Sequence, residues 1–175
     1  MALISASLPQ ALPHPRTRLI GRQGEITAAR ALLLDEAVPL LTLIGSGGVG
    51  KTRLALAVAA QVAEHFADGV AFVDLAALTD PPLVPGTVAR AVGAPTLDGA
   101  ALEDLLTAHL RPRQTLLLLD NCEHLLAPIA DLTGRLLATC PALRPRSRKR
   151  RKPCQSFDSA NSGSTQTCRL RMAFL

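Results

Sequence analysis

The sequence predicts an α/β fold in which helices cover both faces of a parallel sheet. Three features of the chain carry this prediction. Short apolar runs alternate with segments of helical periodicity, a glycine-rich loop joins the first apolar run to a helix, and the most apolar run ends on an acid. Strands and helices that alternate along a chain form a parallel sheet with right-handed crossovers.

The composition agrees with one domain that has an aliphatic core. The chain has 175 residues, of which 48% are hydrophobic but only 2% are aromatic. A chain of this length can bury a sizeable core. Leu, Ala and Val must therefore supply most of the packing.

The first part of the chain contains a leader, a helix and a strand. Residues 1–16 include Pro9, Pro13 and Pro15 and have little periodicity, so we expect a flexible leader. The apolar spacing of residues 25–33 predicts a helix, and residues 40–44 form a short apolar run typical of a buried strand.

The remaining elements alternate in the same way. Helical spacing and stop signals predict a helix from residue 53 to about His65. Apolar runs and periodic segments then predict further strands and helices, in order: strand 70–75, helix 80–92, helix 98–110, strand 115–120 and helix 121–140.

The loop after the first strand matches a phosphate-binding pattern, G-x-x-x-x-G-K-[ST], at every fixed position. Its glycines let successive backbone N–H groups point at phosphate oxygens, and the helix that follows adds its positive N-terminal end. The lysine can reach the β- and γ-phosphates, and the threonine hydroxyl can ligate Mg²⁺. The residues that we assign to nucleotide binding are Gly45, Ser46, Gly47, Gly48, Val49, Gly50, Lys51 and Thr52.

A glycine-rich turn before an ordinary helix is the alternative explanation of this loop. The context favours phosphate binding, because residues 40–44 indicate a strand and residues 53–60 a helix. Strand, loop and helix in this order form the arrangement that the motif requires.

Asp120 is the second candidate for the same site. It follows four leucines of a predicted buried strand, which would bring its carboxylate to the carboxyl edge of the sheet. There it could join Thr52 in holding Mg²⁺. Acids at strand ends are common, so the assignment depends on the phosphate loop upstream.

Glu123 and His124 lie in the first turn of the helix predicted after Asp120. Either side chain could act as a base for an attacking water, and Glu123 is our catalytic candidate. The alternative is that Glu123 stabilises the helix dipole, which is the usual reason for an acid at this position.

The basic residues are concentrated in the C-terminal segment. Residues 1–143 contain ten Lys/Arg and thirteen Asp/Glu, whereas residues 144–175 contain nine Lys/Arg and one Asp. The net charge of +5 therefore does not predict nucleic-acid binding by the folded part.

Cysteines and targeting signals give little further information. The four cysteines, at positions 122, 140, 154 and 168, form no C-x-x-C pair, so ordinary reduced thiols are predicted. The N-terminus lacks the pattern of a secretion signal, and the apolar runs fall well short of the roughly 20 residues that cross a bilayer. We expect a cytoplasmic protein that does not bind membranes.

These motifs together resemble the NB-ARC-like (STAND) P-loop ATPases. Within that class they are most similar to the ATPase domain of large bacterial LuxR-type and antibiotic-regulator-type transcription factors. The resemblance covers residues 17–143 and is carried by four segments of the chain: Leu19-Ile20-Gly21-Arg22, residues 43–55 with the phosphate loop, residues 70–76, and residues 116–126 with Asp120-Asn121-Cys122-Glu123-His124.

The resemblance implies a three-layer α/β/α P-loop NTPase fold and an ATP/ADP switch rather than a fast metabolic enzyme. It implies that residues 45–52 bind phosphates, that Thr52 and Asp120 bind Mg²⁺, and that Ile20, Gly21 and Arg22 line the adenine pocket. Taken without the family, the spacing of residues 17–33 favours a helix that simply packs on the sheet edge. Many relatives have a second acid after the strand aspartate, where this chain has Asn121, so slow or absent ATP hydrolysis is implied.

The resemblance ends after Leu143. The family continues with a strand whose terminal polar residues sense the γ-phosphate, and this strand lies between the phosphate-loop strand and the strand of Asp120. Here residues 144–153 are rich in Arg, Lys and Pro, which excludes a strand. We therefore expect an incomplete sheet, weak nucleotide binding, marginal stability and a disordered tail over residues 144–175.

The tail has two explanations. One is an out-of-frame or truncated C-terminus, favoured by the abrupt change in composition where a strand is due. The other is a basic segment at residues 144–152 that binds nucleic acid non-specifically.

The sequence is compatible with three functions. The first is an ATP/ADP-binding switch module of a signalling or transcriptional regulator, with self-association or a regulator as partner. The second is a small Mg-dependent NTPase, for which no substrate site is evident. The third is nucleic-acid binding through the tail.

Overall fold

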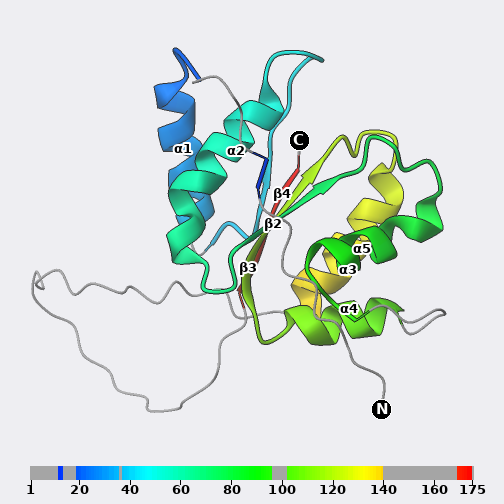
Figure 1. Cartoon of the computed structure of the whole chain (residues 1–175). Helices are drawn as coiled ribbons and strands as arrows, with labels where there is room; N and C mark the ends of the chain where they lie inside the picture. Colours follow the sequence, from blue (N-terminus) through cyan, green and yellow to red (C-terminus); the bar gives the residue numbers. More distant parts are fainter. Residues whose placement is uncertain (1–11, 14–18, 36, 96–101, 140–168, 175) are drawn as a thin grey trace, which may run out of the picture.

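The computed structural model describes residues 12–13, 19–35, 37–95, 102–139 and 169–174. These residues form three layers, in which a parallel sheet stands between two groups of helices (Figure 1). The predicted α/β class is thus confirmed.

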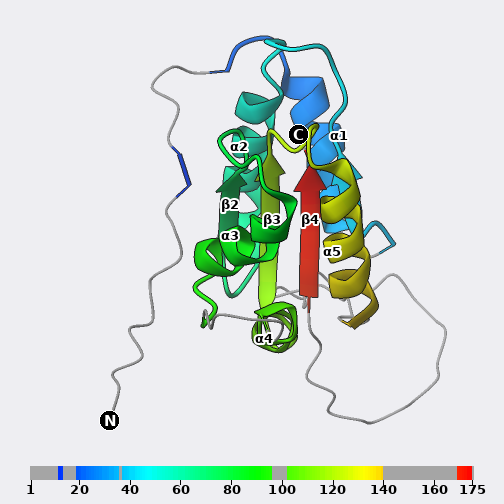
Figure 2. The same ribbon diagram turned by 90° about the vertical axis from the view of Figure 1, so that its right-hand side faces the viewer.

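The sheet has four parallel strands in the order β1-β4-β3-β2. Its strands are β1 (Leu40–Thr42), β2 (Val70–Asp74), β3 (Gln114–Asp120) and β4 (Arg169–Phe174). Figure 2 shows β2, β3 and β4 side by side, with their carboxyl ends at the same edge of the sheet.

Strand β4 corrects one expectation from the sequence. The sheet was expected to lack a strand between the phosphate-loop strand and the strand of Asp120, with residues 144–175 disordered. Instead, residues 169–174 form β4 in this position, where Met172 is opposite Leu40 on one side and Leu117 on the other. The N–H and C=O groups on the facing edges of β1 and β3 would otherwise be unpaired, so these edges favour pairing with an inserted strand. The expectations for residues 140–168 lie outside the described residues.

Helices cover both faces of the sheet. Helices α1 (Gln23–Leu34) and α2 (Lys51–Val62) lie on one face, and α3 (Val84–Ala91), α4 (Leu102–Leu110) and α5 (Leu126–Thr139) on the other (Figure 1). Short 3₁₀ turns extend α2 at Ala63–His65 and precede α3 at Pro81–Leu83.

Strand β3 divides the core into two parts. Leu116 packs with apolar residues of α1 and α2, and Leu118 packs with Ala55 and Leu56 of α2. Leu117 and Leu119 pack with residues of α3, α4 and α5. All four leucines are at most 1% exposed. The run of leucines thus has a physical cause, because alternate residues of a strand point to opposite faces and both faces are covered here.

Most element boundaries lie close to those that the sequence predicted, with one clear exception. The last helix was expected to begin at Asn121, but α5 begins at Leu126. Asn121 has φ 56°, in the left-handed region, and residues 122–125 separate it from α5, so it is not the cap of this helix. The intervening residues form a turn at the carboxyl edge of the sheet.

The leader predicted over residues 1–16, apart from residues 12–13, lies outside the described residues. Among the described helices, none combines the length and apolarity needed to span a bilayer.

Deletion of residues 169–175 tests the role of β4. Loss of this strand would leave the facing edges of β1 and β3 unpaired, at a cost of about 1–3 kcal/mol for each buried group left unsatisfied. We expect the truncated chain to unfold at a much lower urea concentration, or without cooperativity, when followed by circular dichroism. Deletion of Leu175 alone is the control. An unchanged midpoint after removal of β4 would contradict this assignment.

His109 makes stability dependent on pH. Burial is the main cause that holds the pKa of the His109 imidazole below its usual value, and the positive charge of the nearby Arg113 adds to it. A hydrogen bond of 3.2 Å from the imidazole to the Val92 carbonyl acts in the opposite direction but is the weaker influence. The folded state therefore favours neutral His109, so this contribution is present above the ordinary pKa of about 6.5 and is lost as the pH falls through the lower folded value.

Urea unfolding at a series of pH values measures this effect. Between about pH 7 and about pH 5, the decline in stability should be smaller in His109→Gln, whose amide can still donate to the Val92 carbonyl but does not titrate. The same decline in both proteins would show that another group is responsible.

Candidate nucleotide-binding site

The glycine-rich loop connects β1 to α2 and needs glycine at two positions in particular. Gly48 and Gly50 have φ values of 78° and 85°, in the left-handed region that other residues rarely adopt. Helix α2 begins immediately afterwards, at Lys51. The loop therefore lies at a helix N-terminus, where the first backbone N–H groups lack partners within the helix and can bind an anion.

Lys51 folds back over the loop. Its ammonium group donates hydrogen bonds to the carbonyl oxygens of Gly45 at 3.0 Å and Ser46 at 3.2 Å. The absence of a side chain at Gly45 leaves room for this arrangement. A Cβ at this position would lie 3.1 Å from a Val49 methyl, which is a tight contact, and 3.8 Å from the Lys51 side chain. The loop thus holds the ammonium group next to the helix N-terminus.

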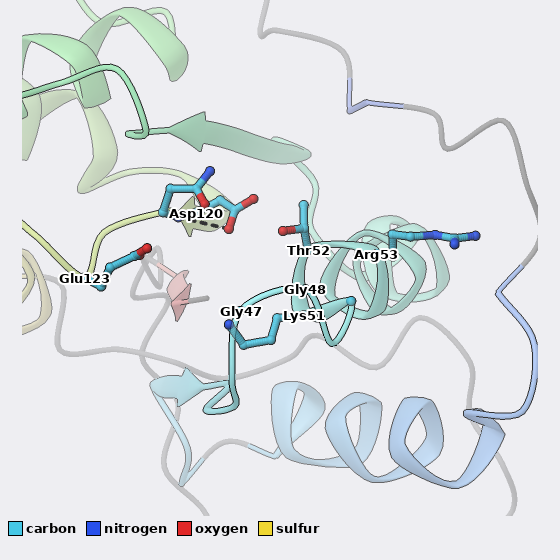
Figure 3. A pocket seen from close by; sticks show the side chains of 9 residues that line it. Gly47, Gly48, Lys51, Thr52, Arg53, Asp120 and Glu123 are labelled. Carbon is cyan, nitrogen blue, oxygen red and sulfur yellow. Dashed lines mark hydrogen bonds between the residues drawn. The ribbon is translucent and has the colours of Figure 1, made fainter.

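A cavity of about 290 Å³ opens beside the loop. Figure 3 shows Thr52 and Asp120 facing each other across it, whereas the Arg53 side chain extends away from Asp120. The cavity is lined by residues of two segments that are far apart in the sequence, namely Gly47, Gly48, Gly50, Lys51, Thr52, Arg53, Asp120, Asn121 and Glu123.

The cavity residues suit a magnesium–phosphate group. Asp120 is only 5% exposed and ends strand β3, which is buried from Thr115 onward, so its carboxylate is held at the edge of the sheet. Within the described residues, no group of three or more His, Cys, Asp or Glu side chains could hold a metal by itself. A phosphate-bound Mg²⁺ needs no such group, because one or two protein oxygens suffice when phosphates and water complete its shell. Thr52 and Asp120 offer such a pair.

A turn at residues 121–125 links β3 to α5, and Asn121 has two roles in it. The backbone N–H of Asn121 donates to Asp120 Oδ1 at 2.9 Å, while its side-chain amide donates to Asp74 Oδ1 at 2.8 Å. A left-handed conformation costs a residue other than glycine on the order of 1 kcal/mol, although Asn tolerates it better than most. These two bonds offset that cost.

The other residues of the turn hold it to the core and to the loop after β2. Cys122 and Leu125 are buried in the core beneath α5. The His124 imidazole donates a hydrogen bond of 2.6 Å to the Leu78 carbonyl, which lies beyond β2. Glu123 lines the cavity, from the turn rather than from the first turn of a helix as expected.

Arg22 contacts the phosphate loop from outside the cavity. Its guanidinium donates to the Val49 carbonyl at 2.9 Å and forms a two-point ion pair with Glu25 at 2.5 and 2.6 Å. Hydrogen bonding to Arg22 lowers the pKa of Glu25, and hydrogen bonding to Glu25 raises the pKa of Arg22. Arg22 therefore holds the loop backbone just before α2.

The adenine-pocket residues implied by the resemblance do not line this cavity. Ile20 is 85% exposed, Gly21 has φ 79°, and Arg22 bonds to the loop as described above. Their role in binding adenine remains a prediction.

Sequence reasoning missed Asp74. It ends β2 directly opposite Asp120 in the sheet register and accepts hydrogen bonds from Asn121 and from the Ala76 backbone. Its position at a strand end, like that of Asp120, was a signal that could have identified it.

A comparison with known families shows which family the chain belongs to. The family model described as "AAA domain" matches residues 35–157. The chain belongs to this family. The match includes the phosphate loop, Asp74 and Asp120, which are also the residues brought to the carboxyl edge of the sheet.

Several curated proteins of mycobacteria and streptomycetes are similar to this chain. Over 114 residues it is 48% identical to "Putative HTH-type transcriptional regulator Rv0890c" of Mycobacterium tuberculosis (strain H37Rv), covering 65% of this chain and 12% of the relative. Over 127 residues it is 40% identical to "Uncharacterized protein Rv0894" of the same strain, covering 73% of this chain and 32% of the relative. It is also 36% identical to "Regulatory protein AfsR" of Streptomyces griseus over 126 residues, covering 65% of this chain and 13% of that protein. The chain thus spans between about a tenth and a third of the length of these relatives.

Replacing Arg22 by Ala should loosen the phosphate loop. The variant loses the charge-assisted hydrogen bond to the Val49 carbonyl, which is a described side-chain contact between residues 22 and 49. Hydrogen–deuterium exchange of the loop amides should therefore be faster in the variant than in the unaltered chain.

Glu25→Gln provides the comparison for this variant. It weakens the ion pair but leaves the Arg22 guanidinium in place, so its effect should be smaller. Unchanged loop exchange in Arg22→Ala would exclude the proposed role of Arg22.

Proposed function

We propose that this chain is an ATP/ADP-binding switch module of a transcriptional regulator, with slow or no hydrolysis. The observation that carries the proposal is the shared cavity, which both the phosphate loop and Asp120 line. A phosphate loop alone supports anion binding, but a carboxylate opposite the loop threonine supports binding of a magnesium–nucleotide complex. Membership of the AAA domain family supports the same conclusion.

The phosphate loop and Asp120 have separate tasks in this proposal. Lys51 exchanges its hydrogen bonds to the Gly45 and Ser46 carbonyls for bonds to nucleotide phosphates. The backbone N–H groups at the start of α2 bind the same phosphates. Thr52 and Asp120 would hold Mg²⁺, which would neutralise phosphate charge.

The residues after β3 support a switch rather than a rapid enzyme. Asn121 stands next to Asp120 and lines the cavity, but an amide cannot take a proton from an attacking water. Glu123 is the ionisable side chain of this turn that lines the cavity and could act as a base. A slow ATPase that uses Glu123 is therefore the second candidate function.

The regulatory role rests on the relatives. Two of them are named as regulators, and each is several times longer than the matched region. We place the chain in the NB-ARC-like, LuxR-type group, in which the nucleotide domain would control an effector domain. Specific DNA binding would then belong to other parts of such a protein, and non-specific binding by residues 144–152 concerns a segment outside the described residues.

ATP and ADP binding test the proposal directly. Titration calorimetry with Mg²⁺ present should detect binding of both nucleotides, and Lys51→Ala should weaken the binding about tenfold or more, because the variant loses charge-assisted bonds to phosphate. Lys51 makes its described bonds to the loop itself, so the variant should fold. Equal affinity of Lys51→Ala and the unaltered chain would refute the proposal.

Phosphate release separates the switch from the slow enzyme. The switch predicts little ATP turnover and no change in Glu123→Gln. Turnover that depends on both Lys51 and Glu123 would favour the ATPase, since general-base catalysis contributes about 100-fold or more.

A further inference from the structure

Asp74 and Asp120 end neighbouring strands and are direct partners in the register of β2 and β3. They differ in environment, because Asp120 is buried and lines the cavity whereas Asp74 is exposed and does not line it. Any effect of Asp74 on the cavity must therefore pass through another residue.

Asn121 connects the two carboxylates. Its side-chain nitrogen donates to Asp74 Oδ1 at 2.8 Å, and its backbone N–H donates to Asp120 Oδ1 at 2.9 Å. An ionised carboxylate only accepts hydrogen bonds, so the amide group must turn its nitrogen, not its oxygen, toward Asp74. The amide oxygen is then the group that Asn121 can offer to the cavity.

The acceptor on Asp74 is itself held in place. The same oxygen, Oδ1, accepts the Ala76 backbone N–H at 3.0 Å. Two further bonds join the segments after β2 and β3, from the Leu75 N–H to the Asp120 carbonyl and from His124 to the Leu78 carbonyl. The turn after β2 thus forms a fixed support for the turn that carries the cavity residues.

We propose that Asp74 is a positioning residue, which fixes the amide of Asn121 so that its oxygen is presented to the cavity and its backbone N–H holds Asp120 for Mg²⁺. The inference deepens the proposed function and rests on it. An amide oxygen can accept a hydrogen bond from a water beside the terminal phosphate but cannot deprotonate it. Asp74 accordingly keeps the bound nucleotide and its metal ordered without promoting hydrolysis.

The spectroscopic test uses the full chain without nucleotide. The side-chain amide of Asn121, identified by its absence in Asn121→Gly, should exchange slowly with solvent in a nitrogen–proton NMR spectrum. Asp74→Ala should accelerate its exchange about tenfold. Asp80→Ala is the control, because Asp80 lies in the same connection and its side chain makes no capping bond. Equal exchange in both variants would overturn the inference.

The functional test follows ATP affinity as Mg²⁺ is added. It measures the Mg²⁺ concentration at which half of the Mg²⁺-dependent gain in affinity is reached. Asp74→Ala should raise this concentration several-fold, whereas its ATP affinity without Mg²⁺ should stay within about twofold, since Asp74 does not line the cavity. In Asp74→Asn the required Mg²⁺ concentration should stay close to that of the unaltered chain, because the amide oxygen can still accept hydrogen bonds from Ala76 and Asn121.

A double variant excludes a purely structural effect and a direct metal contact by Asp74. Glycine suits the left-handed φ of residue 121, so Asn121→Gly should fold. In this background, Asp74→Ala should have no further effect on the Mg²⁺ requirement, and a full additional effect would overturn the inference. The proposed function fails separately, through an absence of Lys51-dependent ATP binding by the unaltered chain.

Discussion

The spacing of the sheet is the constraint on which the site depends. One strand, β4, stands between β1 and β3. Neighbouring strands lie about 4.8 Å apart, so the ends of β1 and β3 are separated by about 10 Å. This distance leaves room between the phosphate loop and Asp120 for phosphates and a metal. If β1 and β3 paired directly, the phosphate loop and Asp120 would lie closer together, and the space between them would be smaller.

Burial of β3 fixes the position of Asp120. The four leucines that precede it are covered on both faces, and each contributes about 1.5–3 kcal/mol on burial. A shift of β3 by one residue would exchange the two faces of the strand and move the carboxylate from the cavity. Packing far from the cavity therefore determines the position of the Asp120 carboxylate.

The local chemistry of the sequence predicted much of this structure. The glycines, Lys51 and Thr52 formed a recognisable loop, and the leucines before Asp120 identified a central strand. The contacts that depend on neighbouring strands could not be predicted in this way. Asp74 became relevant only through its register with Asp120, and Arg22 only through its bond to the Val49 carbonyl. Residues 169–174 were missed because this short run follows a segment rich in Ser, Thr, Gln and Asn, and its pairing partners on β1 and β3 are far away in the sequence.

The loop after β1 and the end of β3 line one cavity, and we propose that together they form one metal–nucleotide site. A double-mutant cycle of Thr52→Ala and Asp120→Asn, followed through the Mg²⁺-dependent part of ATP affinity, tests it most directly. Two ligands of one ion should be coupled, so the double variant should lose less than the combined losses of the single variants, with a coupling of about 1 kcal/mol or more. Fully additive losses would contradict a shared site.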